Sequence, residues 1–126
     1  MLARSRRLSD ARGFARVRRQ GRACNHALLV VVSTPTGVST ADQEAPTRVG
    51  FSVSKRVGGA VVRNLVKRRL RAVVAGLLPN LSPNYDIVII ARPALADASF
   101  QDLAVALSST LRRARLLHTE TGLHGT

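Results

Sequence analysis

The segment from Lys55 to Arg71 contains seven lysine and arginine residues and no aspartate or glutamate. Solvated surfaces usually mix both signs of charge, so solubility alone does not explain such a run. The whole chain shares the imbalance, with 20 cations against 7 acids in 126 residues and a formal net charge of +13. An excess of this size destabilises a compact chain through self-repulsion. We therefore expect a polyanionic partner, with nucleic acid and an anionic membrane surface as the candidates.

The remaining composition indicates one folded domain. Hydrophobic residues make up 45% of the chain, which is typical of a globular protein, and 126 residues is the size of a single domain. We expect one domain over residues 1–126, with its core within 7–117 and a frayed tail over 119–126.

Three features bear on the compartment. The longest apolar run, residues 27–32, is too short to span a bilayer. No apolar stretch follows the arginines at positions 4, 6 and 7, so we expect no signal peptide. A single cysteine, Cys24, cannot form a bridge within the chain, which fits a reducing, cytoplasmic setting.

Three segments carry the signals of helices, and they cover residues 9–20, 60–78 and 99–117. Ser9 is expected to cap the first helix, and Gly21 to end it. Ser99 and Asp102 have the spacing of a capping pair at the start of the third. The third helix also has an apolar stripe at i, i+3 and i+4 spacing, expected to consist of Phe100, Leu103, Leu107, Leu111 and Ala114.

Strands are expected at residues 27–33, 48–54 and 86–91, with a short edge strand at 22–25. The 86–91 segment is apolar on both sides, which predicts a central strand. A surface loop over 34–47 would allow 27–33 and 48–54 to pair as a hairpin. The order α-β-β-β-α-β-α predicts an α/β (α+β) two-layer sandwich, in which helices cover one face of a small mixed sheet and the other face is more open.

The helix expected at 60–78 is divided lengthwise by its residue types. At about 100° per residue, its core-facing stripe is expected to consist of Val62, Val66, Leu70, Val73 and Leu77. Beside this stripe, Arg63, Lys67 and Arg71 recur every four residues, and Asn64 and Arg68 form the next row. Like charges at this spacing repel by about 0.2–0.5 kcal/mol per pair, so a purely structural role explains them poorly. A row of cations along a helix suits a phosphate backbone, although Asn64 can also bond locally at the helix start.

The run RVGFSVSKRVGGAVVRNLVKRRLR, from Arg48 to Arg71, resembles the signature of the bacterial ribonuclease P protein subunit. That family has a strand ending in Ser-Val-Ser-Lys, a turn containing glycine, and a helix with the pattern Ala-Val-x-Arg-Asn-x-x-Lys-Arg-x-x-Arg. Weaker likeness extends to residues 7–21 and to the segment DIVIIARP. The resemblance thus covers most of residues 7–117.

The resemblance implies the protein part of a ribonucleoprotein whose RNA removes the 5′ leader from precursor tRNA. Mg²⁺ ions held mainly by the RNA would do the catalysis, and no catalytic residue or cofactor is expected on the protein. A left-handed β-α-β crossover is also implied, against the usual right-handed one. The residues implied to bind the catalytic RNA lie on the basic helix or just before it: Lys55, Arg56, Arg63, Asn64, Lys67, Arg68 and Arg71. A cleft between the first helix and the open sheet face is implied to bind the leader, at Phe14, Arg18, Val31 and Ser52.

Two departures from the family pattern affect these expectations. Leu65 stands where the family usually has a basic residue, and its position off the main cationic row suggests that the change is tolerated. Arg18 and Val31 stand where the family often has aromatic residues. Base stacking on the leader should therefore be weak, and leader binding should depend more steeply on salt.

Other functional classes are weighed against this one. A structural RNA-binding protein, such as a ribosomal protein, shares the basic charge and the small α/β fold. A basic amphipathic membrane binder fits less well, because the apolar side of the 60–78 helix is aliphatic and has no tryptophan. A nuclease made of protein alone is not expected, since no acid pair has the spacing for general acid and base work and the three histidines, at 26, 118 and 124, lack metal-ligand spacing.

Overall fold

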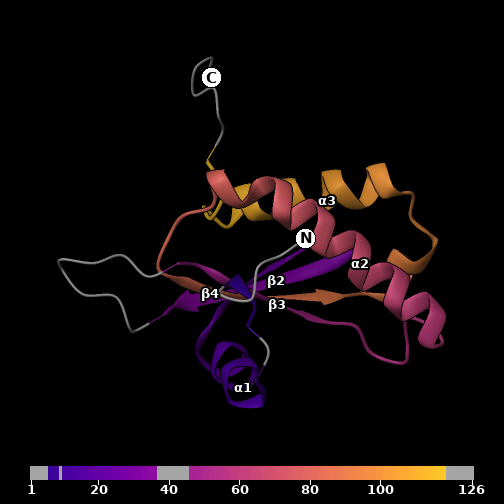
Figure 1. Cartoon of the computed structure of the whole chain (residues 1–126), viewed down its shortest axis with the longest axis horizontal. Coiled ribbons are helices and arrows are strands. Elements are labelled where there is room, and N and C mark those ends of the chain that lie inside the picture. The colour runs from indigo at the N-terminus through magenta and orange to yellow at the C-terminus, as the bar shows by residue number, and fades with distance from the viewer. Residues whose placement is uncertain (1–5, 9, 37–45, 119–126) are drawn as a thin grey trace.

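The computed structural model describes residues 6–8, 10–36 and 46–118. The elements, in chain order, are α1 (Ala11–Gln20), β1 (Arg22–Asn25), β2 (Leu29–Pro35), β3 (Arg48–Ser52), α2 (Ala60–Leu77), the short 3-10 helix η2 (Leu78–Asn80), β4 (Tyr85–Ala91), the 3-10 helix η3 (Pro93–Asp97) and α3 (Phe100–Arg113). The expected α+β class, with a four-stranded mixed sheet and three helices, is confirmed. The helices do not all lie on one face: α2 and α3 cover one side of the sheet, and α1 crosses the other (Figure 1).

The strand order in the sheet is β1-β2-β4-β3. The β1–β2 and β2–β4 pairs are antiparallel, and β3 pairs with β4 in parallel. The expected hairpin between residues 27–33 and 48–54 is therefore wrong, because β4 lies between them. A strand that is apolar on both sides gains most from a central position, as predicted for β4. Parallel pairing of β3 with β4 requires a crossover, and α2 provides it.

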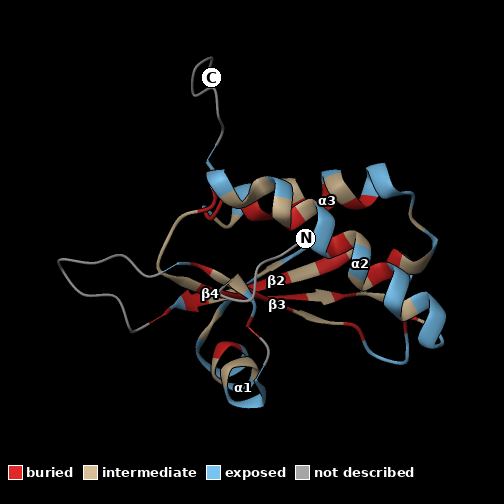
Figure 2. Ribbon diagram, viewed as in Figure 1, coloured by how far each residue is buried: buried red, intermediate tan, exposed pale blue. Residues whose placement is uncertain are grey.

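Apolar side chains form a core on each side of the sheet (Figure 2). The larger core lies between the sheet and the pair α2 and α3, and includes Leu29, Val31 and Ile89. The smaller core lies under α1 and consists of Leu8, Val17, Val32 and Val88, with Phe14, Val30 and Ile90 packed against it. Successive residues of β2 thus alternate between the two cores, as the pleat of a strand requires.

The helix ends agree with the sequence predictions in part. Asp10 caps α1, with its Oδ1 accepting from the backbone N–H of Gly13 at 2.6 Å, whereas the expected cap, Ser9, lies outside the described residues. Ser99 caps α3 as predicted, since its Oγ accepts from the N–H of Asp102 at 3.0 Å. Phe100 is 48% exposed, so its assignment to the apolar stripe is wrong. It is the first residue of α3, and the buried stripe begins one turn later, at Leu103.

The third helix is also shorter than the predicted 99–117. It ends at Arg113, and Arg115 has a φ of 62°, in the left-handed region that closes many helices. The chain then turns back, so that Leu116 and Leu117 are buried in the larger core. Within the described residues, no helix is both long and apolar enough to cross a membrane. Most of the expected loop (37–45) and the expected tail (119–126) lie outside the described residues.

Candidate nucleic-acid interface

The residues expected to bind RNA lie along one flank of α2, beside the stripe that packs on the sheet. We call Arg63, Asn64, Lys67, Arg68 and Arg71 the α2 flank. Asn64, Arg68 and Arg71 are exposed, and Arg63 and Lys67 are partly buried. The adjacent stripe of the helix buries Val66, Leu70 and Val74 at four-residue spacing, which places the flank at the margin of the packed face.

The core stripe of α2 is shifted from the predicted one. Val62 is 37% exposed, so its placement in the core is wrong, and Val74 is buried in its stead. Val73 and Leu77 are partly buried and pack against the larger core, as expected. Val62 belongs to the first turn of α2, which extends past the packed part of the helix (Figure 2).

No carboxylate neutralises the α2 flank within the described residues. Both ion pairs found there use Asp86, which binds Arg16 and Arg48. The Nε atom of Arg63 is buried and has no hydrogen-bond partner among the described residues. A buried donor without a partner costs about 1–3 kcal/mol. The flank is therefore a free cationic surface, as the sequence predicts.

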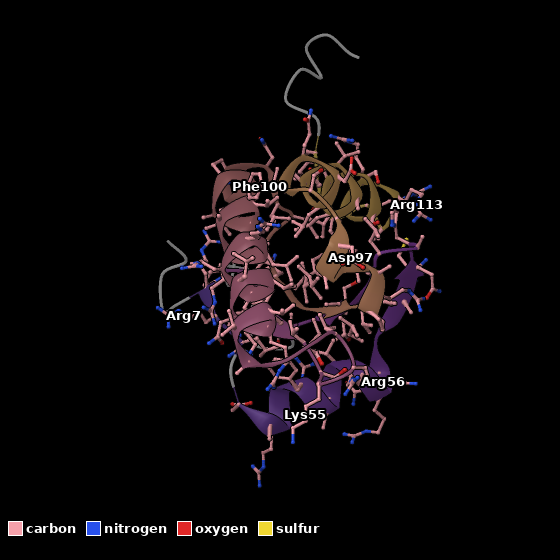
Figure 3. The ribbon with its side chains drawn as sticks, turned by 90° about the vertical axis from the view of Figure 1, so that its right-hand side faces the viewer. Arg7, Lys55, Arg56, Asp97, Phe100 and Arg113 are labelled. Carbon is pink, nitrogen blue, oxygen red and sulfur yellow. The ribbon has the colours of Figure 1, made fainter. Side chains whose placement is uncertain are left out.

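Two hollows adjoin the flank and share two of its cations. The α2 groove has a volume of ≈ 420 Å³ and is lined by Val61, Asn64, Lys67, Arg68 and Arg71. The β3-edge cleft has a volume of ≈ 170 Å³ and is lined by Arg7, Leu8, Phe14, Val49, Gly50, Phe51, Lys67 and Arg71. Because Lys67 and Arg71 line both, the cationic surface continues from α2 over the edge of the sheet. Arg7 lies on the same side of the molecule as α2 (Figure 3).

Gly50 allows the apolar wall of the β3-edge cleft to form. A Cβ atom at this position would lie 2.4 Å from the carbonyl oxygen of Leu8 and 2.6 Å from Cζ of Phe14. Only a residue without a side chain permits this close approach of ring and backbone. Phe14 therefore closes the cleft against β3.

A third hollow, the α1 groove, lies between α1 and the sheet. Its volume is ≈ 340 Å³, and its lining consists of Arg18, Val30, Ser52, Ser54, Arg56, Ile90, Ala91, Arg92 and Pro93. Arginines from α1, the β3–α2 turn and the end of β4 meet around an apolar floor formed by Val30 and Ile90. Such a groove can hold a strand of nucleic acid by its phosphates while its bases contact the floor.

Comparison with known proteins identifies the family. The family model described as Ribonuclease P matches residues 2–115 of the chain. The chain belongs to the ribonuclease P protein family. It is 45% identical over 116 residues to the ribonuclease P protein component of Streptomyces bikiniensis, covering 90% of this chain and 94% of the relative. It is 37% identical over 129 residues to the component from a Cyanothece species, covering 94% and 98%.

Solved structures of ribonuclease P proteins have the same fold. The Staphylococcus aureus protein aligns with a TM-score of 0.79 at 25% identity, covering 91% of this chain and 100% of that one. The Thermotoga maritima protein aligns with a TM-score of 0.73 at 25% identity, covering 85% and 96%. As a member of this family, the chain is the protein component of an endoribonuclease and partners an RNA subunit.

The leader cleft expected from the ribonuclease P resemblance divides in the structure. Arg18 and Ser52 line the α1 groove together, whereas Phe14 lines the adjoining β3-edge cleft. Val31 is in neither: it is 0% exposed and packs in the larger core. Its assignment to the cleft is wrong because a shift of one residue along a strand moves a side chain to the other face of the sheet. Val30 is the β2 residue that faces the groove.

Sequence reasoning missed two cations of this interface, Arg7 and Arg92. Arg92 follows β4 directly, and it lines the α1 groove while its Nε donates to the carbonyl oxygen of His26 at 2.8 Å. Arg92 follows β4 and Arg56 lies beyond the end of β3, and both lie at the same edge of the sheet because these two strands are parallel; no local pattern in the sequence signals that pairing. Lys55 and Arg56 lie just before α2, as expected. Lys55 is exposed in the β3–α2 turn, and Arg56 lines the α1 groove.

A buried carboxylate attaches α1 to the sheet and so fixes the α1 groove. Asp86 is 0% exposed, and its Oδ1 and Oδ2 accept from Nε and Nη2 of Arg48, each at 2.9 Å. Nη2 of Arg16, from α1, also donates to Oδ2. Hydrogen bonding to Asp86 raises the pKa of Arg48, so this guanidinium stays charged. No local pattern in the sequence signals this pairing, since Arg16 and Asp86 are 70 positions apart.

Proposed function

We propose that the protein binds the catalytic RNA of ribonuclease P through the α2 flank. The single observation that carries this proposal is the row of cations on α2 that no described carboxylate neutralises, in a chain of net charge +13. Arginine can grip a phosphate with two donors, and spacing along a helix matches successive phosphates. Lys55 and Arg56 extend the cationic surface towards the α1 groove.

We further propose that the α1 groove binds the 5′ leader of precursor tRNA. Its arginines Arg18, Arg56 and Arg92 supply phosphate contacts, and Ser52 and Ser54 supply hydroxyl groups that can donate or accept. No aromatic residue lines this groove, since Phe14 and Phe51 line the neighbouring cleft. Leader binding should then rest on charge and be only weakly selective for base identity.

In this proposal the RNA subunit carries the chemistry, with Mg²⁺ held mainly by RNA phosphates. The donor groups of the residues that the structure describes do not fit a magnesium site. No group of three or more histidine, cysteine, aspartate or glutamate residues in the described part of the chain could hold a metal ion. Magnesium in proteins is usually held by one or two carboxylates together with several waters, whereas no carboxylate lines these grooves and their cations are arginine and lysine. No step is therefore assigned to a protein-bound metal.

Reconstitution tests the proposed function. The chain, the catalytic RNA from the same cell and a precursor tRNA are combined at near-physiological magnesium, and release of the 5′ leader is measured. We expect cleavage to be faster with the chain than with the RNA alone, and absent with the chain alone. Cleavage by the chain alone would contradict the proposed division of labour. An RNA activity that the chain leaves unchanged would contradict the function itself.

A further inference from the structure

A fourth hollow lies apart from the proposed RNA surfaces. We call it the α3 groove: it has a volume of ≈ 340 Å³, lies between the C-terminal end of α3 and the β1–β2 edge of the sheet, and is lined by residues that include Gln20, Arg22, Cys24, Ser33, Tyr85 and Arg113. It shares no lining residue with the other three hollows. Arg113 and Arg7 lie on opposite sides of the molecule (Figure 3).

The sheet register places three of these side chains on one face. Arg22 lies opposite Ser33 in the antiparallel β1–β2 pair, and residues directly opposite each other project to the same side. Tyr85 lies opposite Pro35, two positions from Ser33, so it projects to that side as well. The ring of Tyr85 is partly buried and packs against the larger core. A guanidinium group and a fixed aromatic ring therefore share the floor of the groove.

The two arginines of the α3 groove have no counter-ion in the described part of the chain. No aspartate or glutamate lines the groove. Both ion pairs among the described residues use Asp86, which does not line the groove. Nη2 of Arg113 donates to the carbonyl oxygen of Asn25 at 2.7 Å, which holds its guanidinium over β1. Its place in the last turn of α3 also suits the helix dipole. That dipole does not account for Arg22, which lies on a strand.

We propose that the α3 groove binds one nucleotide of a single-stranded RNA segment. Arg22 and Arg113 would hold its phosphate, and Tyr85 would stack on its base, with the amide of Gln20 at the groove edge. The volume falls within the range of about 300–1,000 Å³ that is typical of small-ligand pockets. None of the exposed large hydrophobic side chains among the described residues lines the groove, which disfavours a lipid surface.

This inference rests on the RNA partnership proposed above, and it adds a contact on the side away from Arg7. The RNA can be the catalytic RNA or the precursor tRNA, because both offer the same phosphate and base chemistry. A protein that grips RNA on two opposite sides would lie between two RNA segments. The charge of Arg22 and Arg113, which the α2 flank and the α1 groove leave unused, would then be neutralised in the assembled particle.

The test compares Arg22→Gln and Arg113→Gln, singly and together, with Arg112→Gln as the matched control. Arg112 lies in the same turn of α3 and is exposed, but it does not line the groove. One arm measures how the affinity of the chain for the catalytic RNA changes with salt concentration. The other measures the affinity of the assembled holoenzyme for precursor tRNA. Losing both arginines removes the contact to one phosphate, so the slope of log affinity against log salt should fall by about 0.7 in one arm, the value for one single-strand phosphate.

The arm that responds identifies which RNA occupies the groove. Tyr85→Phe should bind that RNA like the unmodified chain, whereas Tyr85→Leu should lose about fivefold or more, because only the ring can stack. Groove variants that behave like Arg112→Gln in both arms would overturn the inference. Failure of the unmodified chain to bind either RNA would instead overturn the proposed function, so the two failures are distinguishable.

Cys24 gives a second measurement that needs no variant. It is the single cysteine of the chain, and it is partly buried in the α3 groove. We expect its alkylation by iodoacetamide to slow when the RNA that occupies the groove is bound. An alkylation rate that stays the same with the catalytic RNA and with precursor tRNA bound would contradict the inference, even if a groove variant fails to fold.

Discussion

Replacing Lys67 and Arg71 together by glutamine removes the two cations that line both the α2 groove and the β3-edge cleft. With the slope of about 0.9 per phosphate contact that is typical of duplex DNA, or about 0.7 for a single strand, the salt slope should fall by about 1.8 or about 1.4. Between 50 and 200 mM salt, the unmodified chain should then lose about 7- to 12-fold more affinity than the variant loses. Filter binding of the catalytic RNA across this range measures the slope.

The same variant should fold at least as well as the unmodified chain. Lys67 and Arg71 are one helical turn apart, so their mutual repulsion disfavours α2 by about 0.2–0.5 kcal/mol, and the variant removes it. Arg69→Gln is the matched control, because Arg69 lies on the same helix, outside the flank, near the carbonyl oxygen of Ala98. An unchanged salt slope in the double variant, or an equal fall in the control, would refute the role of the α2 flank. Thermal unfolding shows whether any binding loss comes from misfolding.

Three further predictions concern single residues. Leu65→Arg should leave thermal stability nearly unchanged, because Leu65 is 37% exposed, and should strengthen binding of the catalytic RNA slightly; a large loss of stability would show that the side chain is needed in the core. Gly50→Ala should lower the free energy of unfolding by about 1–3 kcal/mol in urea titration, since its Cβ would meet Phe14 and backbone, and an unchanged midpoint would contradict that packing. Asp86→Asn should lower the free energy of unfolding by at most roughly 3–5 kcal/mol, and by less than that because water reaches the two arginine partners. The variant should also bind the leader more weakly than its lost stability explains. Full leader affinity in the folded variant would show that the Asp86 anchor of α1 does not position the α1 groove.

The α2 flank could be predicted from the sequence because its determinants are local. The cations and the apolar residues recur every four positions, and this spacing alone separates the buried side of a helix from its exposed side. The alternation of apolar and small residues over 48–54 likewise marks the side chains that face the larger core, where Val49 and Val53 are buried. The prediction for Val62 was wrong because Val62 lies in the first turn of α2. The apolar spacing extends into this turn, but the turn does not pack against the core.

The remaining features depend on contacts between distant residues. The prediction of a hairpin considered only strands that are neighbours in the sequence. In the structure β4, which is apolar on both sides, takes the place between β2 and β3, and β3 therefore pairs with β4 in parallel. The prediction for Val31 was wrong because Val30, Val31 and Val32 are all valines, and any of them could face either side of the sheet. The residue types therefore do not decide which of them face the larger core. The Asp86 anchor and the α3 groove join residues from opposite ends of the chain, such as Arg22 and Arg113, and no spacing signals them.

Lysine footprinting tests the central claim most directly, because the chain contains two lysines, Lys55 and Lys67, and both lie in the proposed RNA surface. Acetylation of each is measured by mass spectrometry in the free chain and in the complex with the catalytic RNA. We predict that Lys67, on the α2 flank, is strongly protected in the complex. Acetylation of Lys67 at the same rate in the free chain and in the complex would contradict the claim that this flank grips the RNA.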